Sequence, residues 1–432
     1  MVGVITLASL YFYQTYAVFT EEKQFNVIKG EIADPGDIYF AYYVDGEITR
    51  SMPKQNTGYK LDTEKSKCTN GVIPGWDYAN WKFTADYTGY NATDYTRTRC
   101  NLYFVKETTV NTVLGTLTVN TFTPDFSKSA CDSTTCETHE KGIFAIEDSD
   151  GTSYYYRGSV ENNYVKFAGY YWRIIRINGN GSIRMIYDGT VAHDNGEYST
   201  DREYGTSQFN PSINNNMYVG YMYTSGNAHG LGTNSTIKVA NDNFYTAKLS
   251  LYSNYLDINA GFCNDRSVVS TSVDNNPGIG TNETIYAGYK RVLESVPSLS
   301  CLNEDYFTGK NATKGNKALT YLVGLITVDE MLLSGYGGGS FEGSMQFTKI
   351  NTNIYLNNGF DFRTMTPVYG KYAIGDGYWS VSVFLSSHNA NGNQINDYSP
   401  TASTGLRPVI NLKNTLRFTG DGTKNNPYIP SI

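Results

Sequence analysis

The stretch that decides the fold of the larger part of the chain is YYYRGSVENNYVKFAGYYWRIIRINGNGSIRMIYDGT, residues 154–190. Aromatic and β-branched side chains pack well on a pleated sheet. Their runs therefore predict three strands, at 154–157, 164–167 and 170–177. Asn178-Gly179-Asn180-Gly181 predicts a hairpin turn, with a return strand at 182–187. Apolar side chains on both faces indicate central strands that are covered on both sides.

Helical patterns occur at two places further along the chain. Around 236–258, apolar residues recur at helical spacing. Thr327-Val-Asp-Glu330 has the form of a capping box, which predicts a short helix that ends near Gly335. The adjacent carboxylates of Asp329 and Glu330 are then expected to stabilise the helix dipole rather than to act in catalysis. Together with the strands, these helices predict an α+β domain over residues 151–432.

Two late strands are predicted at 378–384 and 405–412, and Pro408 marks the second as an edge strand or a bulge. Between them, residues 385–404 have few large apolar side chains, so we expect a loop that adds little to stability. Long loops of this kind are often functional, and Tyr with Ser, Gly and Asn is the composition of natural binding loops. An unselective surface loop is the alternative. The predicted ligand-binding residues are His388, Asn389, Asn391, Asn393, Asn396 and Tyr398.

A smaller β domain is predicted for residues 21–107. Strand formers fill 38–44, and Asp45-Gly46 is a hairpin signal. Short strands separated by turns favour an immunoglobulin-like β-sandwich. A bridge between Cys68 and Cys100 could tie its two sheets together.

Residues 108–150 are predicted to be a linker with a Cys loop, Cys131 to Cys136. Asp148 and Asp150 at its end form a D-x-D-G loop, whose oxygen atoms are weak candidates for binding calcium. The loop lacks the remaining positions of a calcium-binding EF-hand, and a surface turn is the alternative. We otherwise expect no cofactor and no metal.

The N-terminal segment, residues 1–20, contains the one long apolar stretch of the chain. At 4–20 this stretch is short for a spanning helix, which needs about 20 residues. It is more typical of a signal peptide with Thr15-Tyr16-Ala17 at the cleavage site, although no basic residue precedes Lys23. A buried element, a membrane anchor and an assembly segment stay open. Any membrane contact is expected only here.

The six cysteines fall into three local pairs, 68–100, 131–136 and 263–301. None of them forms C-x-x-C, so the spacing of a zinc site is absent, and three sequential disulfides are predicted. Disulfides persist in oxidising compartments, which predicts a secreted or cell-surface protein. Six reduced thiols in a cytosolic protein are the alternative.

The composition excludes several classes of protein. The net charge is −7, only 17% of residues are charged, and the chain holds 38 tyrosines and 42 glycines. The aromatic content argues against global disorder. The acidic balance argues against nucleic acid as a partner, because nucleic-acid binding normally requires a basic stripe.

Motifs of catalysis are missing from the sequence. His139, His193, His229 and His388 do not have the spacing of a metal site, and we expect each to be an exposed loop residue. Neither a nucleophile elbow nor a phosphate-binding loop is present. Arg407 lies in an apolar strand, where a structural ion pair or a backbone clamp is expected. Trp172 and Trp379 are expected in the core.

Four strings are distinctive together: residues 154–190, AGFCNDRS at 260–267, GNKALTYLVGLITVDE at 315–330, and GLRPVINLK at 405–413. They resemble a group of exported surface proteins of gram-positive gut bacteria. These proteins share a C-terminal domain that looks like the C-type-lectin-like fold in its formylglycine-generating-enzyme variant. FNVIKGEIADPGDIYFAYYVDGE, residues 25–47, resembles the small β domain that follows their signal peptide. The resemblance therefore implies a C-type-lectin-like domain at 151–432.

Departures from those families limit what the resemblance implies. Formylglycine-generating enzymes bind copper through a late pair of cysteines, and here no cysteine follows Cys301. Calcium-dependent C-type lectins use Glu-Pro-Asn or Gln-Pro-Asp with Trp-Asn-Asp, and none of these strings occurs. The sequence therefore favours a non-enzymatic surface protein for adhesion or ligand recognition, with a protein or glycan partner. A structural subunit of an extracellular filament, pilus or surface layer, with copies of itself as partners, is the alternative.

Overall fold

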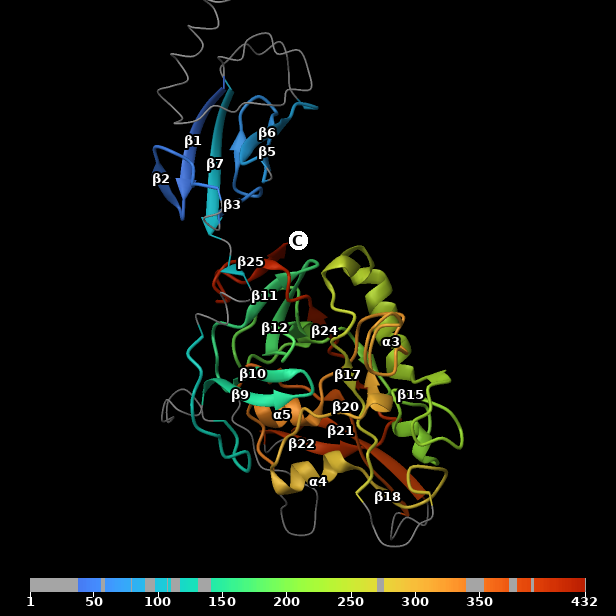
Figure 1. Ribbon diagram of the computed structural model, residues 1–432. Coiled ribbons are helices and arrows are strands. Elements are labelled where there is room, and N and C mark those ends of the chain that lie inside the picture. Colours follow the sequence, from blue (N-terminus) through green and yellow to red (C-terminus); the bar gives the residue numbers. More distant parts are fainter. Residues whose placement is uncertain are drawn as a thin grey trace, which may run out of the picture. The chain divides into compact units, whose positions relative to one another are not determined.

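The protein is described from a computed structural model (Figure 1), which describes residues 38–55, 59–78, 80–89, 98–106, 108–109, 117–130, 141–269, 276–338, 353–372, 379–389 and 392–431. The chain divides into two compact units, Met1–Thr108, the small unit, and Thr109–Ile432, the large unit. The molecule is a β-rich α+β protein, as predicted. The predicted signal peptide or anchor at 1–20 and the Cys131 to Cys136 loop lie outside the described residues.

The small unit contains two sheets. The first has the order β2-β1-β7-β3, with β4 also paired to β7, and the second is the hairpin β5-β6. Phe83 and Trp76 of the hairpin pack onto the core that Leu102 and Phe104 of β7 form. The strands are β1 (Ile38–Val44), β2 (Glu47–Thr49), β3 (Tyr59–Leu61), β4 (Lys67–Cys68), β5 (Ile73–Asp77), β6 (Lys82–Asp86) and β7 (Thr98–Lys106).

Two local predictions for the small unit can be compared with this structure. Asp45 and Gly46 both have positive φ and join β1 to β2, so the predicted hairpin is confirmed. Cys68 and Cys100 form the predicted disulfide. However, they face each other in neighbouring strands β4 and β7, so the bridge lies within one sheet. The expectation that it ties two sheets together was wrong, because the strand order was not readable from the cysteine spacing.

The first sheet of the large unit contains the strands that residues 154–190 predict. Its order is β24-β13-β12-β10-β9, with β11 paired to β12. Both faces of β12 and β13 are almost entirely buried, as the apolar pattern indicated. The strands are β9 (Gly142–Asp148), β10 (Gly151–Arg157), β11 (Tyr164–Phe167), β12 (Tyr170–Ile177), β13 (Ile183–Gly189) and β24 (Val409–Leu412).

Strand β9 overturns part of the predicted linker at 108–150. It pairs along its whole length with β10, and Ile143 is buried in the main core. Phe126, earlier in the same region, packs against a satellite core that contains Phe144. These residues therefore belong to the large unit. Their apolar side chains are too few and too scattered for sequence to show which sheet they join.

The second sheet of the large unit has the order β14-β23-β20-β21-β22, with β18 paired to β20. Figure 1 shows β20, β21 and β22 side by side in orange to red. The strands are β14 (Thr206–Ser207), β18 (Thr284–Ile285), β20 (Phe362–Tyr372), β21 (Trp379–Asn389), β22 (Gly392–Tyr398) and β23 (Thr404–Gly405).

The predicted loop at 385–404 is therefore largely a β-hairpin, made of β21 and β22. Leu385 and Ile395 are fully buried, and Ser386 pairs with Ile395 across the hairpin. The expectation of a loop was wrong, because one apolar residue of the segment in each strand is buried and β21 pairs with the long strand β20. The predicted strand at 405–412 is instead split between β23 and β24, and Pro408, which lacks an N–H, lies at the break.

The described helices are short. The capping box is confirmed: Thr327 accepts from the Glu330 N–H, and α5 ends before Gly335. Around 236–258, the predicted helix is an α-helix that continues into a π turn and a 3-10 helix. They are α3 (Thr236–Phe244), α4 (Ala287–Glu294), α5 (Val328–Ser334), the π turn η5 (Tyr245–Leu249), and the 3-10 helices η3 (Thr200–Arg202), η4 (Asn216–Val219), η6 (Ser250–Tyr255) and η7 (Asn303–Asp305).

Short strands complete the structure. β15 (Met222–Tyr223) pairs with β16 (Thr233–Asn234), β17 (Phe262–Cys263) with β19 (Tyr306–Phe307), and β25 (Arg417–Thr419) with β26 (Ile429–Ser431). β8 covers Thr108–Thr109. The predicted Cys263–Cys301 disulfide is present and fixes β17 to the segment after α4. Trp172 is fully buried, as predicted, whereas the side chain of Trp379 lies outside the described residues.

Candidate functional site

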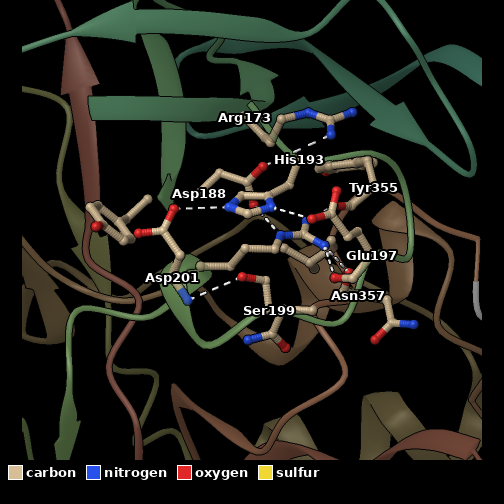
Figure 2. A network of polar contacts seen from close by, with 12 residues as sticks. Arg173, Asp188, His193, Glu197, Ser199, Asp201, Tyr355 and Asn357 are labelled. Carbon is tan, nitrogen blue, oxygen red and sulfur yellow. Dashed lines mark hydrogen bonds and ion pairs between the residues drawn. The ribbon is translucent and has the colours of Figure 1, made fainter. Parts of the chain in front are cut away.

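The centre of the large unit holds a cluster of buried charges, which we call the Asp188 cluster: Asp188, Arg173, Arg202 and Arg407. Asp188 ends β13, and its Oδ1 accepts hydrogen bonds from Arg202 Nε at 2.8 Å and from Arg407 at 2.9 Å. Arg173 of β12 lies 4.0 Å from the other carboxylate oxygen. Figure 2 shows Arg173 reaching toward this carboxylate from the sheet.

One carboxylate cannot satisfy three guanidinium groups, and backbone carbonyl groups accept further hydrogen bonds from Arg202 and Arg407. Arg202 donates to Tyr355 O at 2.7 Å, and Arg407 donates to Leu356 O at 2.6 Å. Burial lowers the pKa of Arg407 to about 10, against the attraction of Asp188. Arg407 is thus the structural ion pair and backbone clamp that its place in an apolar strand predicted. The cluster holds segments that are far apart in the chain.

His193 lies beside this cluster and is only 3% exposed. Its Nδ1 is 2.7 Å from Glu197 Oε1 and its Nε2 is 2.9 Å from Asp201 Oδ2. In Figure 2 the imidazole ring lies between the two carboxylates. Burial acts to raise the pKa of Asp201, but hydrogen bonds from His193 and Thr190 outweigh it, so that pKa lies below its ordinary value. The expectation that His193 is an exposed loop residue was wrong. Glu197 and Asp201, which follow it closely in the chain, supply a hydrogen-bond partner for each ring nitrogen, so the ring can be buried.

The other histidines differ from one another. His229 is partly exposed and its Nδ1 lies 3.1 Å from the buried carboxylate of Asp305. His139 and the side chain of His388 lie outside the described residues. His229 is therefore also more engaged than an exposed loop residue.

An open hollow of about 610 Å³ lies against the same network, and we call it the polar hollow. Sites for small ligands typically have volumes of about 300–1,000 Å³. Three stretches of chain and Asn353 form its walls: the approach to β11, the loop after β13, and the turn between β25 and β26. Its lining residues are Ser159, Glu161, Tyr164, Asp194, Asn195, Asn353, Thr423, Lys424 and Asn425.

Arg173 links the walls of the polar hollow to the Asp188 cluster. It donates to Asn195 Oδ1 at 2.8 Å and to Val160 O at 2.9 Å. Its guanidinium carbon lies 3.8 Å from the ring centroid of Tyr164. The Tyr164 hydroxyl in turn donates to His193 O at 2.7 Å. These contacts hold the walls in place without a ligand, which reduces the entropy cost of binding one.

Several polar groups of the polar hollow are available to a ligand. Ser159 is 7% exposed, and its Oγ has no hydrogen-bond partner within the described part of the chain. Asp194 and Lys424 form an ion pair of 2.8 Å at the rim. Glu161 and Asn425 are exposed beside them. A buried hydroxyl without a partner normally requires one, so Ser159 indicates a place for a polar atom of a ligand or a water molecule.

The ligand-binding residues predicted from sequence lie elsewhere in the large unit. Asn396 is half-buried and its Oδ1 accepts from the Asp397 N–H at 2.9 Å. Tyr398 is 45% exposed, with its ring 6.0 Å from the Arg363 guanidinium. His388 and Asn389 belong to β21 and Asn393 to β22, but their side chains and the whole of Asn391 lie outside the described residues. Figure 1 places β22 well away from β11, so the hairpin and the polar hollow are separate surfaces.

The two weak calcium candidates are held by cations of the protein. Asp148 Oδ2 lies 3.1 Å from Arg176 and accepts from the Gly179 N–H at 2.8 Å. Asp150 forms an ion pair with Lys314. Among the residues that the structure describes, no group of three or more His, Cys, Asp or Glu side chains is arranged to hold a metal ion. The carboxylates of Asp148 and Asp150 therefore act as parts of the turn between β9 and β10.

A third charged network surrounds Glu330, which is 1% exposed at the start of α5. Burial acts to raise its pKa, but Arg184 and Arg176 outweigh this effect and lower the pKa to about 2. Arg291 similarly joins Asp329 and Asp265. The space beside these groups is only about 30 Å³, enough for a single water molecule. This network holds α5 against the first sheet.

Comparison with known proteins places this chain with none of them. No family of known proteins, no curated protein and no solved structure matches it. Within the described ranges, no helix has the length and apolar character needed to cross a membrane.

Proposed function

We propose that this is a non-enzymatic, secreted or cell-surface protein that recognises an extracellular ligand, a protein or a glycan, through its large unit. The observation that carries the proposal is the polar hollow. Arg173 ties its walls to the buried Asp188 cluster, and each of its lining residues carries a polar group. A preformed concave site with a few convergent polar groups is the usual form of a binding site.

The two disulfides, Cys68–Cys100 and Cys263–Cys301, support an extracellular location. Such bonds persist in oxidising compartments. A low density of charge and a high content of Tyr, Asn and Thr fit the same location. Each unit holds one of these two bridges, which suits a protein that works outside the cell.

Recognition is supported over catalysis by the state of His193, which directly precedes the lining residues Asp194 and Asn195. The ring is buried, and a carboxylate lies at hydrogen-bond distance from each of its nitrogen atoms. A general base must reach the proton that it removes, and this ring has both nitrogen atoms engaged. Its carbonyl oxygen instead holds Tyr164 in place.

For the fold, we propose an immunoglobulin-like sandwich for the small unit and a C-type-lectin-like domain for the large unit. The parallel pairing of β1 with β7 beside an antiparallel sheet supports the first. An antiparallel sheet and a second, mainly antiparallel sheet, with short helices and long irregular segments, support the second.

The second candidate function is a structural subunit of an extracellular filament or surface layer. One observation favours it: β22 is the outermost strand of its sheet. Outer strands are available to pair with another chain. In this case the partners are copies of the same protein.

The experiment is to apply the labelled full chain to a glycan array and to immobilised extracellular-matrix proteins. Saturable binding to one class of ligand is the expected result. Turnover of a bound glycan would contradict the non-enzymatic assignment. Electron microscopy of the natural cell surface separates scattered single molecules, which recognition predicts, from regular polymers, which would favour the second candidate.

A further inference from the structure

We infer that the polar hollow binds a neutral saccharide. The inference rests on the proposed recognition function and names the class of ligand and the residues that bind it. It follows from the charge of the lining, from the kinds of hydrogen-bonding group there, and from the unsatisfied hydroxyl of Ser159.

The charge of the polar hollow excludes an anionic ligand. Its lining carries two carboxylates, Glu161 and Asp194, and one cation, Lys424. Lys424 lies 2.8 Å from Asp194, and this hydrogen bond raises the pKa of Lys424 above its ordinary value. The lining therefore offers no excess positive charge, which phosphate, sulfate or carboxylate groups would require.

The hydrogen-bonding groups fit hydroxyl groups. Each sugar hydroxyl donates one hydrogen bond and accepts others. Glu161 can accept, the Asn425 amide can do both, and the Ser159 hydroxyl can do both. Amides and carboxylates next to one another can therefore pair with neighbouring hydroxyls of one ring.

A peptide ligand fits the polar hollow less well. Peptide-binding grooves owe their affinity to apolar recesses or to pairing with a strand edge. The lining contains one aromatic side chain, Tyr164, which is 3% exposed. One face of that ring is covered by the Arg173 guanidinium at 3.8 Å. The hollow therefore recognises polar groups rather than apolar side chains.

Ser159 is the lining residue of the polar hollow whose hydroxyl lacks a hydrogen-bond partner among the described residues. Its buried Oγ has no partner among the described residues, and it lies next to Val160, whose carbonyl oxygen accepts from both Arg173 and Asn195. A hydroxyl of the saccharide satisfies this atom. Removing Ser159 Oγ therefore weakens binding without a loss of stability, since the folded protein makes no hydrogen bond with it.

The experiment uses the full chain on an array of neutral, sialylated and sulfated oligosaccharides, followed by titration calorimetry with the strongest neutral ligand. Ser159→Ala, Glu161→Gln and Asn425→Ala are the test variants. Each is expected to weaken binding by about tenfold, the loss typical of one hydrogen bond to a ligand. Glu294→Gln, which removes an exposed carboxylate on α4, is the matched control and keeps full affinity. The melting temperature of every variant is measured alongside.

Each outcome decides the inference. Selective binding of neutral saccharides that the three variants weaken, at unchanged melting temperature, supports it. A preference for sialylated or sulfated glycans overturns it. Neutral glycans bound equally by the variants, or a protein ligand in place of a glycan, also overturn it but leave the recognition function standing. Failure of the full chain to bind any glycan or matrix protein contradicts the proposed function itself.

Discussion

Asp188 is the residue on which the interior of the large unit depends most. It is fully buried and is the carboxylate that Arg202, Arg407 and Arg173 share. Its neighbours reach it from distant parts of the chain, since Arg407 lies 219 residues away. Loss of its charge leaves buried guanidinium groups without a counter-ion.

We predict that Asp188→Asn lowers the free energy of unfolding of the large unit by about 3–5 kcal/mol, because breaking a buried ion pair leaves an uncompensated charge. Urea denaturation measures the change. Glu294→Gln, which removes an exposed ion pair with Lys290 on α4, is the matched control. The control is expected to change stability by about 0–1 kcal/mol. A small effect of Asp188→Asn would show that the carbonyl contacts alone hold the cluster.

His229 predicts a dependence of stability on pH. The hydrogen bond with Asp305 raises the pKa of His229 above its ordinary value of 6.5, although burial acts against this, with further effects of Arg266 and Glu304. A raised pKa contributes stability that is present below 6.5 and is lost as pH rises through the folded value. The melting temperature should therefore fall as pH rises above 6.5. In His229→Gln this part of the fall should disappear, and an identical pH profile in both proteins would refute the assignment.

At the scale of elements, the sequence correctly predicted turns and helix caps, which depend on neighbouring residues. It did not predict strand pairing between distant segments. The turn at residues 178–181 and the Thr327 capping box formed as predicted, because each depends on residues within a few positions. The prediction of a loop at 385–404 failed, because this segment pairs with β20, and a sequence pattern does not show pairing between separate segments. Most side chains of β22 are polar, so the sequence pattern did not indicate that its one aliphatic residue, Ile395, is buried in the core.

We predict that Ile395→Ala destabilises the large unit by about 2–5 kcal/mol, the cost of emptying a fully buried aliphatic site. Asn396→Ala, the neighbouring half-buried position, should cost far less. Chemical denaturation of both variants makes the comparison. Equal and small effects would mean that the hairpin is peripheral to the core, as a loop would be.

At the scale of the whole molecule, the two units have separate hydrophobic cores and separate disulfides. Each core is therefore expected to unfold in its own transition. We predict that Cys68→Ser combined with Cys100→Ser lowers the stability of the small unit by about 2–4 kcal/mol. Differential scanning calorimetry should show the transition of the large unit at its original temperature. A shift of both transitions would mean that the units unfold together.

The third predicted disulfide, Cys131–Cys136, lies outside the described residues. Peptide mapping without reduction of the secreted protein tests it directly. One bridged peptide containing both cysteines is the expected result. A bridge from either cysteine to another part of the chain would reject the pairing.

The sequence by itself determined features that depend on neighbours in the chain. These are the β-rich α+β class, the strands of residues 154–190, the capping box, and the local pairing of Cys68 with Cys100 and of Cys263 with Cys301. The spacing of apolar side chains and the residues of a turn are properties of short stretches of chain. The disulfides were predicted because each pair of cysteines is grouped within one region of the chain. The sequence also predicted that Arg407 has an ion-pair or hydrogen-bond partner, because a buried arginine without a partner in an apolar segment is strongly unfavourable.

Only the tertiary structure brought the residues of the candidate site together. Ser159, Asn195 and Asn425 stand in polar segments that look alike in sequence, and nothing in their spacing brings them together. Arg173 joins two of these segments through Val160 and Asn195, while the turn between β25 and β26 closes the third side. A site assembled from three distant loops depends on the packing of sheets. Packing energies depend on contacts across the fold and not on the order of residues along the chain.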